Sequence, residues 1–476
     1  FSLFSFVSPA LGSGILFTYP EIATIAGVQG VIVYALASAL PMLIFGFVGP
    51  VIRRKCPEGF VLTEWTRQRY GMVAMLYLSF VTLVTLFLYM VSELSGVGQV
   101  INLLTGLDDL PVMIVQCVVT TIYTSFGGFK ISFLTDTIQG AMVMGLVVVA
   151  AITIGVEVDI KRDLIEESGL LKASLVGWQL LYILPVAIFT NDFFLAQLWL
   201  RTFASKTDKD LMIGTSLATF AILCVIVLVG STGLVAVWSA SWPGDPAQAG
   251  SVAFFSLLDS LPSWVVGVVL VMVVCLSTSA FDSIQSAMVS TASNDLFRNR
   301  LNIWVTRGLV VVVIIPVVAI ALQAPSILQI YLISDLVSAA TVPVLCIGLS
   351  DRFYFWRGFE FVVGSLGGIL TVWIFGAIYY DDPMKGAELL LLQQGLYSGD
   401  WGAFGAFVAA PVGGLVWGFG ALALRLTYQY VMARVKGHRF DALDRPAADD
   451  DAPAPEDAEV IIQQGAVKSK ASGRFF

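Results

Sequence analysis

Residues 212–244 read MIGTSLATFAILCVIVLVGSTGLVAVWSASWPG, a run of 33 residues without a charged side chain. A helix needs about 20 apolar residues to cross the hydrocarbon core of a bilayer. Charged residues make up only 13% of the 476, against roughly 25% in soluble proteins. The sequence therefore predicts an all-α polytopic membrane protein. Further uncharged stretches occur at 22–52, 71–92, 111–129, 137–156, 261–281, 308–334, 361–380 and 401–424.

These stretches predict twelve spans, and the basic residues give their direction. If the first span leaves the cytoplasm, only Lys161, Arg162, Lys172 and Lys385 lie outside, so 22 of the 26 lysines and arginines lie in cytoplasmic segments. We therefore expect both ends of this chain to be cytoplasmic. The expected location is the plasma membrane. The spans are predicted at 2–23, 27–50, 72–104, 110–127, 133–156, 175–199, 210–239, 263–293, 304–323, 326–349, 358–379 and 402–428.

The composition argues against an enzyme. The one histidine, His438, lies in the polar C-terminal tail, and the five cysteines have no metal-ligand spacing. We expect no catalytic residue, no cofactor and no metal beyond a coupling ion. No basic patch with interleaved aromatics suggests nucleic acid, so the expected partners are the lipid bilayer and a small polar solute. The oligomeric state is left open.

Two predicted spans carry helix-breaking residues at matching positions. Span one contains Ser8-Pro9-Ala10-Leu11-Gly12-Ser13-Gly14, and span six contains Pro185 followed by Thr190-Asn191-Asp192. Spans one and six are five spans apart, and an odd number of crossings brings the chain to the other side of the membrane. A second unit of five spans would therefore be inverted relative to the first. Paired interrupted helices are typical of inverted-repeat transporters, whereas ordinary proline kinks and glycine packing are the alternative.

The predicted organisation has three parts. Residues 1–350 form a ten-helix inverted-repeat core, 351–432 form two peripheral spans, and 433–476 form a cytoplasmic, largely disordered tail rich in Ala, Pro, Asp and Glu. The chain starts inside an apolar segment without a methionine, and we expect one preceding helix to be missing.

The segment after span four is the most specific motif. Residues 123–130 read YTSFGGFK, and residues 135–140 read TDTIQG. This pattern resembles the signature of the sodium/solute symporter family, in which a Gly-Gly turn is followed by Thr-Asp and then Gln. The resemblance extends over nearly the whole chain. It implies that Asp136 lies on the inner cation route, whereas a helix-capping aspartate is the simpler alternative.

A second group of motifs narrows the branch of that family. Residues 53–57 read RRKCP, residues 63–71 read TEWTRQRYG, and residues 199–201 read WLR before span seven. Their order resembles the urea and polyamine active transporters of fungi and plants.

The resemblance also implies a cation site between spans one and eight. Adjacent hydroxyl-bearing residues on span eight usually bind Na⁺ together with backbone carbonyls of the broken first span. Counting back from Asp295 places Ser279 and Ala280 there, so one hydroxyl is lost. The implied cation-binding residues are Pro9, Gly12, Leu276, Ser279 and Ala280. The coupling ion is therefore left open as Na⁺ or H⁺.

Several acidic residues fall within predicted spans, where a charge is costly and tends to face a cavity or a partner. No Lys or Arg lies at a comparable depth in the predicted spans, and the alternative for each acid is a neutral, hydrogen-bonded side chain in a water-lined path. The expected cation-route residues are Asp136, Asp282 and Glu93. The expected substrate-binding residues are Tyr19, Glu93, Asn191, Asp192, Phe193 and Asp335.

Together these features predict a cation-coupled symporter that imports a small polar solute by alternating access. Buried acids without a deep basic residue argue against an anionic substrate, and we expect urea first and polyamine second. The alternatives are a Na⁺-coupled permease for another solute such as proline, and a transporter-like nutrient sensor.

Overall fold

The computed structural model describes residues 6–7, 10–56, 62–244, 247–258, 260–298, 300–323, 326–396, 399–440, 442–443 and 474–476, with the backbone alone at 126–133. Within these residues the chain is helical, with no strand. The α-helices are α2 (Ile15–Ala39), α3 (Met42–Lys55), α4 (Leu62–Tyr70), α5 (Met72–Thr105), α6 (Asp109–Glu157), α7 (Arg162–Glu167), α8 (Leu175–Asn191), α9 (Ala196–Ala204), α10 (Asp208–Trp238), α11 (Ala253–Leu258), α12 (Ser263–Thr291), α13 (Ile303–Ala321), α14 (Ile327–Cys346), α15 (Gly358–Tyr379), α16 (Pro383–Leu390) and α17 (Gly402–Lys436).

Ten segments of the described chain are long and apolar enough to cross a membrane, and one shorter apolar helix, Asp109–Ser125, accompanies them. The ten are Ile15–Lys55, Met72–Thr105, Leu134–Glu157, Leu175–Phe194, Asp208–Trp238, Ser263–Leu296, Ile303–Ala321, Ile327–Leu349, Gly358–Tyr379 and Gly402–Lys436.

The first of these segments reverses direction at Gly27. The Tyr19 and Tyr34 rings stack with centroids 4.0 Å apart, and the Tyr19 hydroxyl donates to Ser38 Oγ at 2.7 Å. Fifteen residues of straight helix would separate these two rings by about 22 Å. Gly27 has φ +62°, and a Cβ there would lie 2.0 Å from the Leu170 carbonyl oxygen. Glycine suits this turn because it tolerates positive φ and leaves room for the neighbouring backbone.

Helix α6 also reverses. The Tyr123 hydroxyl donates to Asp282 Oδ2 at 2.6 Å, and Thr135 Oγ1 donates to the same oxygen at 3.2 Å. Twelve residues of straight helix would separate the donors by about 18 Å, too far for one oxygen to join them. The chain therefore turns back between Ser125 and Leu134, where the two apolar segments end and begin. With both reversals the described residues make twelve passes, as the sequence predicts.

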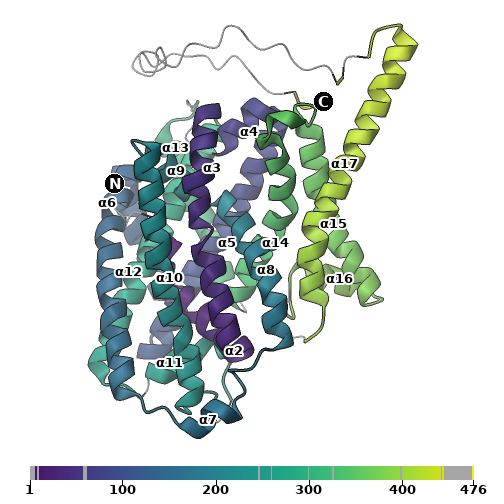
Figure 1. The fold of residues 1–476 in the computed structure, drawn as a ribbon. Coiled ribbons are helices and arrows are strands. Elements are labelled where there is room, and N and C mark those ends of the chain that lie inside the picture. The colour runs from purple at the N-terminus through teal and green to yellow at the C-terminus, as the bar shows by residue number, and fades with distance from the viewer. Residues whose placement is uncertain are drawn as a thin grey trace.

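The two faces of the bundle differ in charge. The end of α3, with Arg53, Arg54 and Lys55, lies with α4 at the top of Figure 1; we call this the α4 face. Helices α7 and α11 lie at the bottom of Figure 1, which we call the α7 face, and their one basic residue is Arg162. This is the asymmetry expected of a polytopic protein.

Both predicted interrupted spans are broken. The α-helical bonding preceding α2 stops after Leu11 and resumes at Gly14–Ile15, while α8 gives way to a 3₁₀ turn at Asp192–Phe194 and then to α9. Helices α2 and α8 pack against each other, so the two breaks face a common interior.

The predicted tail, 433–476, falls largely outside the described residues. Its described parts show α17 continuing to Lys436 and Arg474–Phe476 lying against the start of α15, where the Phe359 amide donates to the Phe475 carbonyl oxygen at 2.8 Å.

Candidate functional site

The broken helices enclose a cavity of about 110 Å³ together with α5, α10, α12 and α14. Three carboxyl side chains line it, from Glu93, Asp192 and Asp335. Four tyrosines line it as well: Tyr19, Tyr34, Tyr89 and Tyr331. Among the described residues of the lining none is basic. The cavity therefore combines negative charge potential with aromatic faces, the two features that bind organic cations.

Glu93 lies at the broken end of α2. Its Oε2 accepts hydrogen bonds from the Ser13 amide and the Ser13 hydroxyl, both at 2.8 Å. The Tyr331 hydroxyl donates to Oε1 at 3.3 Å. The side chain is 1% exposed, so these bonds replace the water that it loses.

Asp192 and Asp335 lie on the other broken span and on α14. Asp192 begins the 3₁₀ turn and is 9% exposed, and Asp335 is 5% exposed. Both line the cavity with Glu93, so a ligand there meets carboxyl groups from three separate helices.

The neighbours Asn191 and Phe193 have other roles. The Asn191 amide donates to the Tyr89 hydroxyl at 2.6 Å, and its oxygen accepts from Ser334 Oγ at 3.2 Å, so it supports the cavity wall. Phe193 is absent from the lining: it packs between Phe189 and Trp199, and its carbonyl accepts from Trp199 Nε1 at 3.0 Å.

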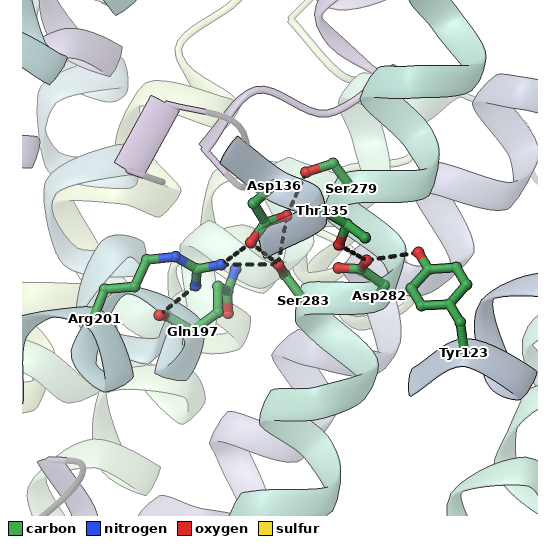
Figure 2. Close-up of polar contacts among 8 residues, drawn as sticks. All are labelled: Tyr123, Thr135, Asp136, Gln197, Arg201, Ser279, Asp282 and Ser283. Carbon is green, nitrogen blue, oxygen red and sulfur yellow. Dashed lines mark hydrogen bonds and ion pairs between the residues drawn. The ribbon is translucent and has the colours of Figure 1, made fainter. Parts of the chain in front are cut away.

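A second polar cluster lies between α6, α9 and α12 (Figure 2). Asp136 pairs with Arg201, and both side chains are 0% exposed. Ser279 Oγ donates to Asp136 Oδ1 at 2.6 Å, and Arg201 donates to Ser283 Oγ at 3.0 Å and to the Gln197 carbonyl at 2.7 Å. A buried carboxylate without such a partner would be very costly, so the guanidinium sets the charge of this cluster to near zero.

Asp282 lies beside this cluster, on the same helix as Ser279. It is fully buried and accepts from both Tyr123 and Thr135 on the two arms of the α6 hairpin. The YTSFGGFK and TDTIQG motifs therefore meet on α12.

The family model described as "Sodium:solute symporter family" matches residues 4–356. The chain belongs to this family. The symporter is 52% identical to the spermidine transporter DUR31 of Candida albicans over 446 residues, which cover 93% of this chain and 85% of that protein. It is 31% identical to the urea-proton symporter DUR3 of Oryza sativa subsp. japonica over 123 residues, 26% of this chain and 17% of that protein. It is therefore a cation-coupled membrane transporter and not an enzyme.

Solved structures share the symporter's fold. A Na⁺-coupled sialic acid symporter in its substrate-bound, outward-open state matches with a TM-score of 0.63 and 15% identity, covering 87% of this chain and 90% of that one. Mhp1, a nucleobase-cation-symport-1 family transporter, matches with a TM-score of 0.57 and 14% identity, covering 91% and 92%. At these identities the likeness concerns the fold alone.

The residues expected to bind a cation lie in different surroundings. Pro9 falls outside the described residues. Gly12 lies against the Glu93 carboxyl, where a Cβ would come within 1.8 Å of Oε1. Leu276 is buried, and Ala280 presents a methyl group to the central cavity. Ser279 directs its hydroxyl to Asp136.

Arg201 corrects one expectation. From the sequence, Arg201 is expected in a cytoplasmic segment, and no basic residue is expected at the depth of the acids. The structure instead places it in α9, the continuation of the broken sixth span, with its guanidinium fully buried against Asp136. A break in a helix carries the chain onward inside the protein, so counting residues from the apolar run ended the span too early.

Tyr89 and Tyr331 were missed by sequence reasoning. Each precedes a predicted acid by four residues, Glu93 and Asp335 respectively, and residues four apart share a helix face. That spacing was the available signal.

Proposed function

We propose that this symporter imports a polyamine, with spermidine as the first candidate, and that urea is the second candidate substrate. This reverses the order expected from the sequence, which was urea first and polyamine second. The observation that carries the proposal is the set of three cavity carboxyls, Glu93, Asp192 and Asp335, without a described basic residue in the lining. Spermidine carries about three positive charges at neutral pH because its amines titrate near lysine's. Urea is neutral and gains little from three acids. The 52% identity to a spermidine transporter supports the same order.

The proposed substrate-binding residues are Tyr19, Glu93, Asp192 and Asp335, with Tyr89 and Tyr331 added. Asn191, which was also expected to bind substrate, is assigned a supporting role through Tyr89 and Ser334, because it lies outside the lining. Phe193 is assigned a packing role, because it lies outside the lining. Tyrosine rings favour ammonium groups through their negative faces, so the four cavity tyrosines suit the same ligand.

We propose H⁺ as the coupling ion. A Na⁺ site needs several oxygen ligands. Ala280 supplies none from its side chain, and the Ser279 hydroxyl donates to Asp136, whose charge Arg201 balances. Asp136 and Asp282 remain the proposed cation-route residues, with Glu93 as the link to the cavity. The partial match to a urea-proton symporter is in keeping with this choice.

The proposed placement is the plasma membrane with the α4 face toward the cytoplasm. The basic residues at the end of α3 and those at the end of α17 support this orientation. Residues 1–350 would then form the transport core and 351–432 the two peripheral spans.

The test uses purified protein in proteoliposomes. Uptake of labelled spermidine and labelled urea is measured with an inward pH gradient, an inward Na⁺ gradient, or neither. The proposal expects accumulation of spermidine with the pH gradient alone. Urea or proline accumulation without spermidine would overturn the substrate assignment, and dependence on Na⁺ alone would overturn the ion.

A further inference from the structure

The break in α2 exposes a backbone donor to the cavity wall. The Leu11 amide still bonds to the Val7 carbonyl at 3.2 Å, and regular bonding resumes with Leu16 to Ser13 and Thr18 to Gly14. Between them the Ser13 amide points to Glu93 Oε2 at 2.8 Å. Donors at the start of a helix, with the helix dipole behind them, form a natural position for a carboxylate.

The protein supplies that carboxylate itself, from α5. Both Glu93 oxygens are held, Oε2 by Ser13 and Oε1 by Tyr331. The backbone beside it is shaped for the fit: a Cβ on Gly12 would lie 1.8 Å from Glu93 Oε1, and one on Gly14 would lie 2.5 Å from the Tyr331 hydroxyl oxygen. Glycine at both positions lets the carboxyl lie directly on the break.

We infer that Glu93 acts as a tethered carboxylate that excludes substrates with a carboxylate of their own, and so separates polyamines from amino acids. Its side chain fills the position at the broken end of α2 where a substrate carboxylate would bind, and repels a second one nearby. Asp192 and Asp335 remain across the cavity to receive ammonium groups. The inference concerns the substrate specificity of the proposed transport site. Only the statement that amines bind there rests on the proposed function.

A matched pair of substrates isolates the effect. Ornithine is 1,4-diaminobutane with one added carboxylate. Wild-type protein in proteoliposomes is expected to take up labelled 1,4-diaminobutane at least tenfold better, by kcat/KM, than labelled ornithine. Because Glu93 is also the proposed link to the cation route, the wild type and Glu93→Ala are compared by counterflow, which needs no ion gradient. Glu93→Ala is expected to narrow the ratio of 1,4-diaminobutane to ornithine at least tenfold through an absolute gain in ornithine exchange. Asp335→Asn is the control, expected to lose amine uptake without gaining ornithine.

A second measurement does not depend on any substrate. Acetate is expected to raise the thermal midpoint of Glu93→Ala in detergent, because it refills the vacated position, and to leave the wild type unchanged at the same ionic strength. The inference is overturned if acetate changes the thermal midpoint of neither protein. It is also overturned if Glu93→Ala loses transport of 1,4-diaminobutane and of ornithine in equal proportion. If the wild type transports neither diamine while acetate still protects Glu93→Ala, the proposed substrate fails and the carboxylate site stands.

Discussion

Arg201 in α9 and Asp136 in α6 form an ion pair with both side chains 0% exposed, far apart in sequence but joined across the α12 serines. Removing one partner of such a pair costs about 3–5 kcal/mol, since the other charge is left buried. The pair therefore fixes α6, α9 and α12 to one another at the depth of the expected cation route.

The first prediction concerns Na⁺ binding at Asp136, whose negative charge the Arg201 guanidinium balances in the wild type. Arg201→Ala leaves Asp136 with Ser279 and Ser283, an oxygen-rich site without its positive charge. We expect Na⁺ to bind there and to stabilise the variant, by about 2.7 kcal/mol at a hundredfold excess over its Kd. Thermal unfolding in NaCl against choline chloride measures this. The thermal midpoint of the wild type should be the same in both salts. If Na⁺ raises the midpoint of both proteins equally, Na⁺ does not replace the Arg201 charge at Asp136.

The second prediction concerns the cavity acids. Asp192→Asn and Asp335→Asn keep the side-chain shape but remove a charge that would meet a substrate amine. A hydrogen bond to a charged group contributes roughly 1.5–3 kcal/mol, so each change should raise the KM for spermidine about 10-fold to 100-fold. Labelled uptake at varied spermidine concentration measures it.

Asp163→Asn provides the matched control for these variants, because Asp163 is exposed on α7. Its KM should equal that of the wild type. Unchanged KM in both cavity variants would remove the acids from substrate recognition.

The sequence predicted the twelve passes because the bilayer imposes a length and an apolar composition on each of them, and because basic residues mark one face. It predicted the two breaks from Pro, Gly and Asn-Asp, and it placed Glu93, Asp192 and Asp335 inside. The hydrogen-bond and ion-pair partners of the acidic residues were harder to predict. Ser13 meets Glu93, and Arg201 meets Asp136, through contacts between helices distant in sequence, for which periodicity carries no information.

The third prediction tests the reversal at Gly27. Ala there must adopt φ +62° and place a Cβ 2.0 Å from the Leu170 carbonyl oxygen. This backbone conformation, with φ +62° and ψ −151°, is essentially restricted to glycine and costs another residue about 1–3 kcal/mol, and the clash adds to it. We expect Gly27→Ala to lower the thermal midpoint in detergent and the yield of folded protein.

Gly145→Ala is the control for that experiment. Gly145 lies within helical α6, and a Cβ there meets nothing within 4 Å. Alanine is favoured over glycine within helices by about 0.5–1 kcal/mol, so this variant should match or exceed the wild-type midpoint. If Gly27→Ala unfolds at the same temperature as Gly145→Ala, the turn does not depend on the glycine.

The fourth prediction concerns the two peripheral spans, α15 and α17, which pack mainly against each other, α14 and α16. Arg425 Nε donates to Glu360 Oε1 at 2.5 Å, with both side chains 0% exposed. Glu360→Gln leaves the Arg425 charge buried, and we expect a loss of about 3–5 kcal/mol in stability. The KM for spermidine should stay at the wild-type value, because neither residue lines the cavity.

Replacing both Glu360 and Arg425 by methionine should restore much of the stability, since an apolar pair of similar volume leaves no charge unpaired. A change in KM with unchanged thermal midpoint would instead connect α15 and α17 to the transport site.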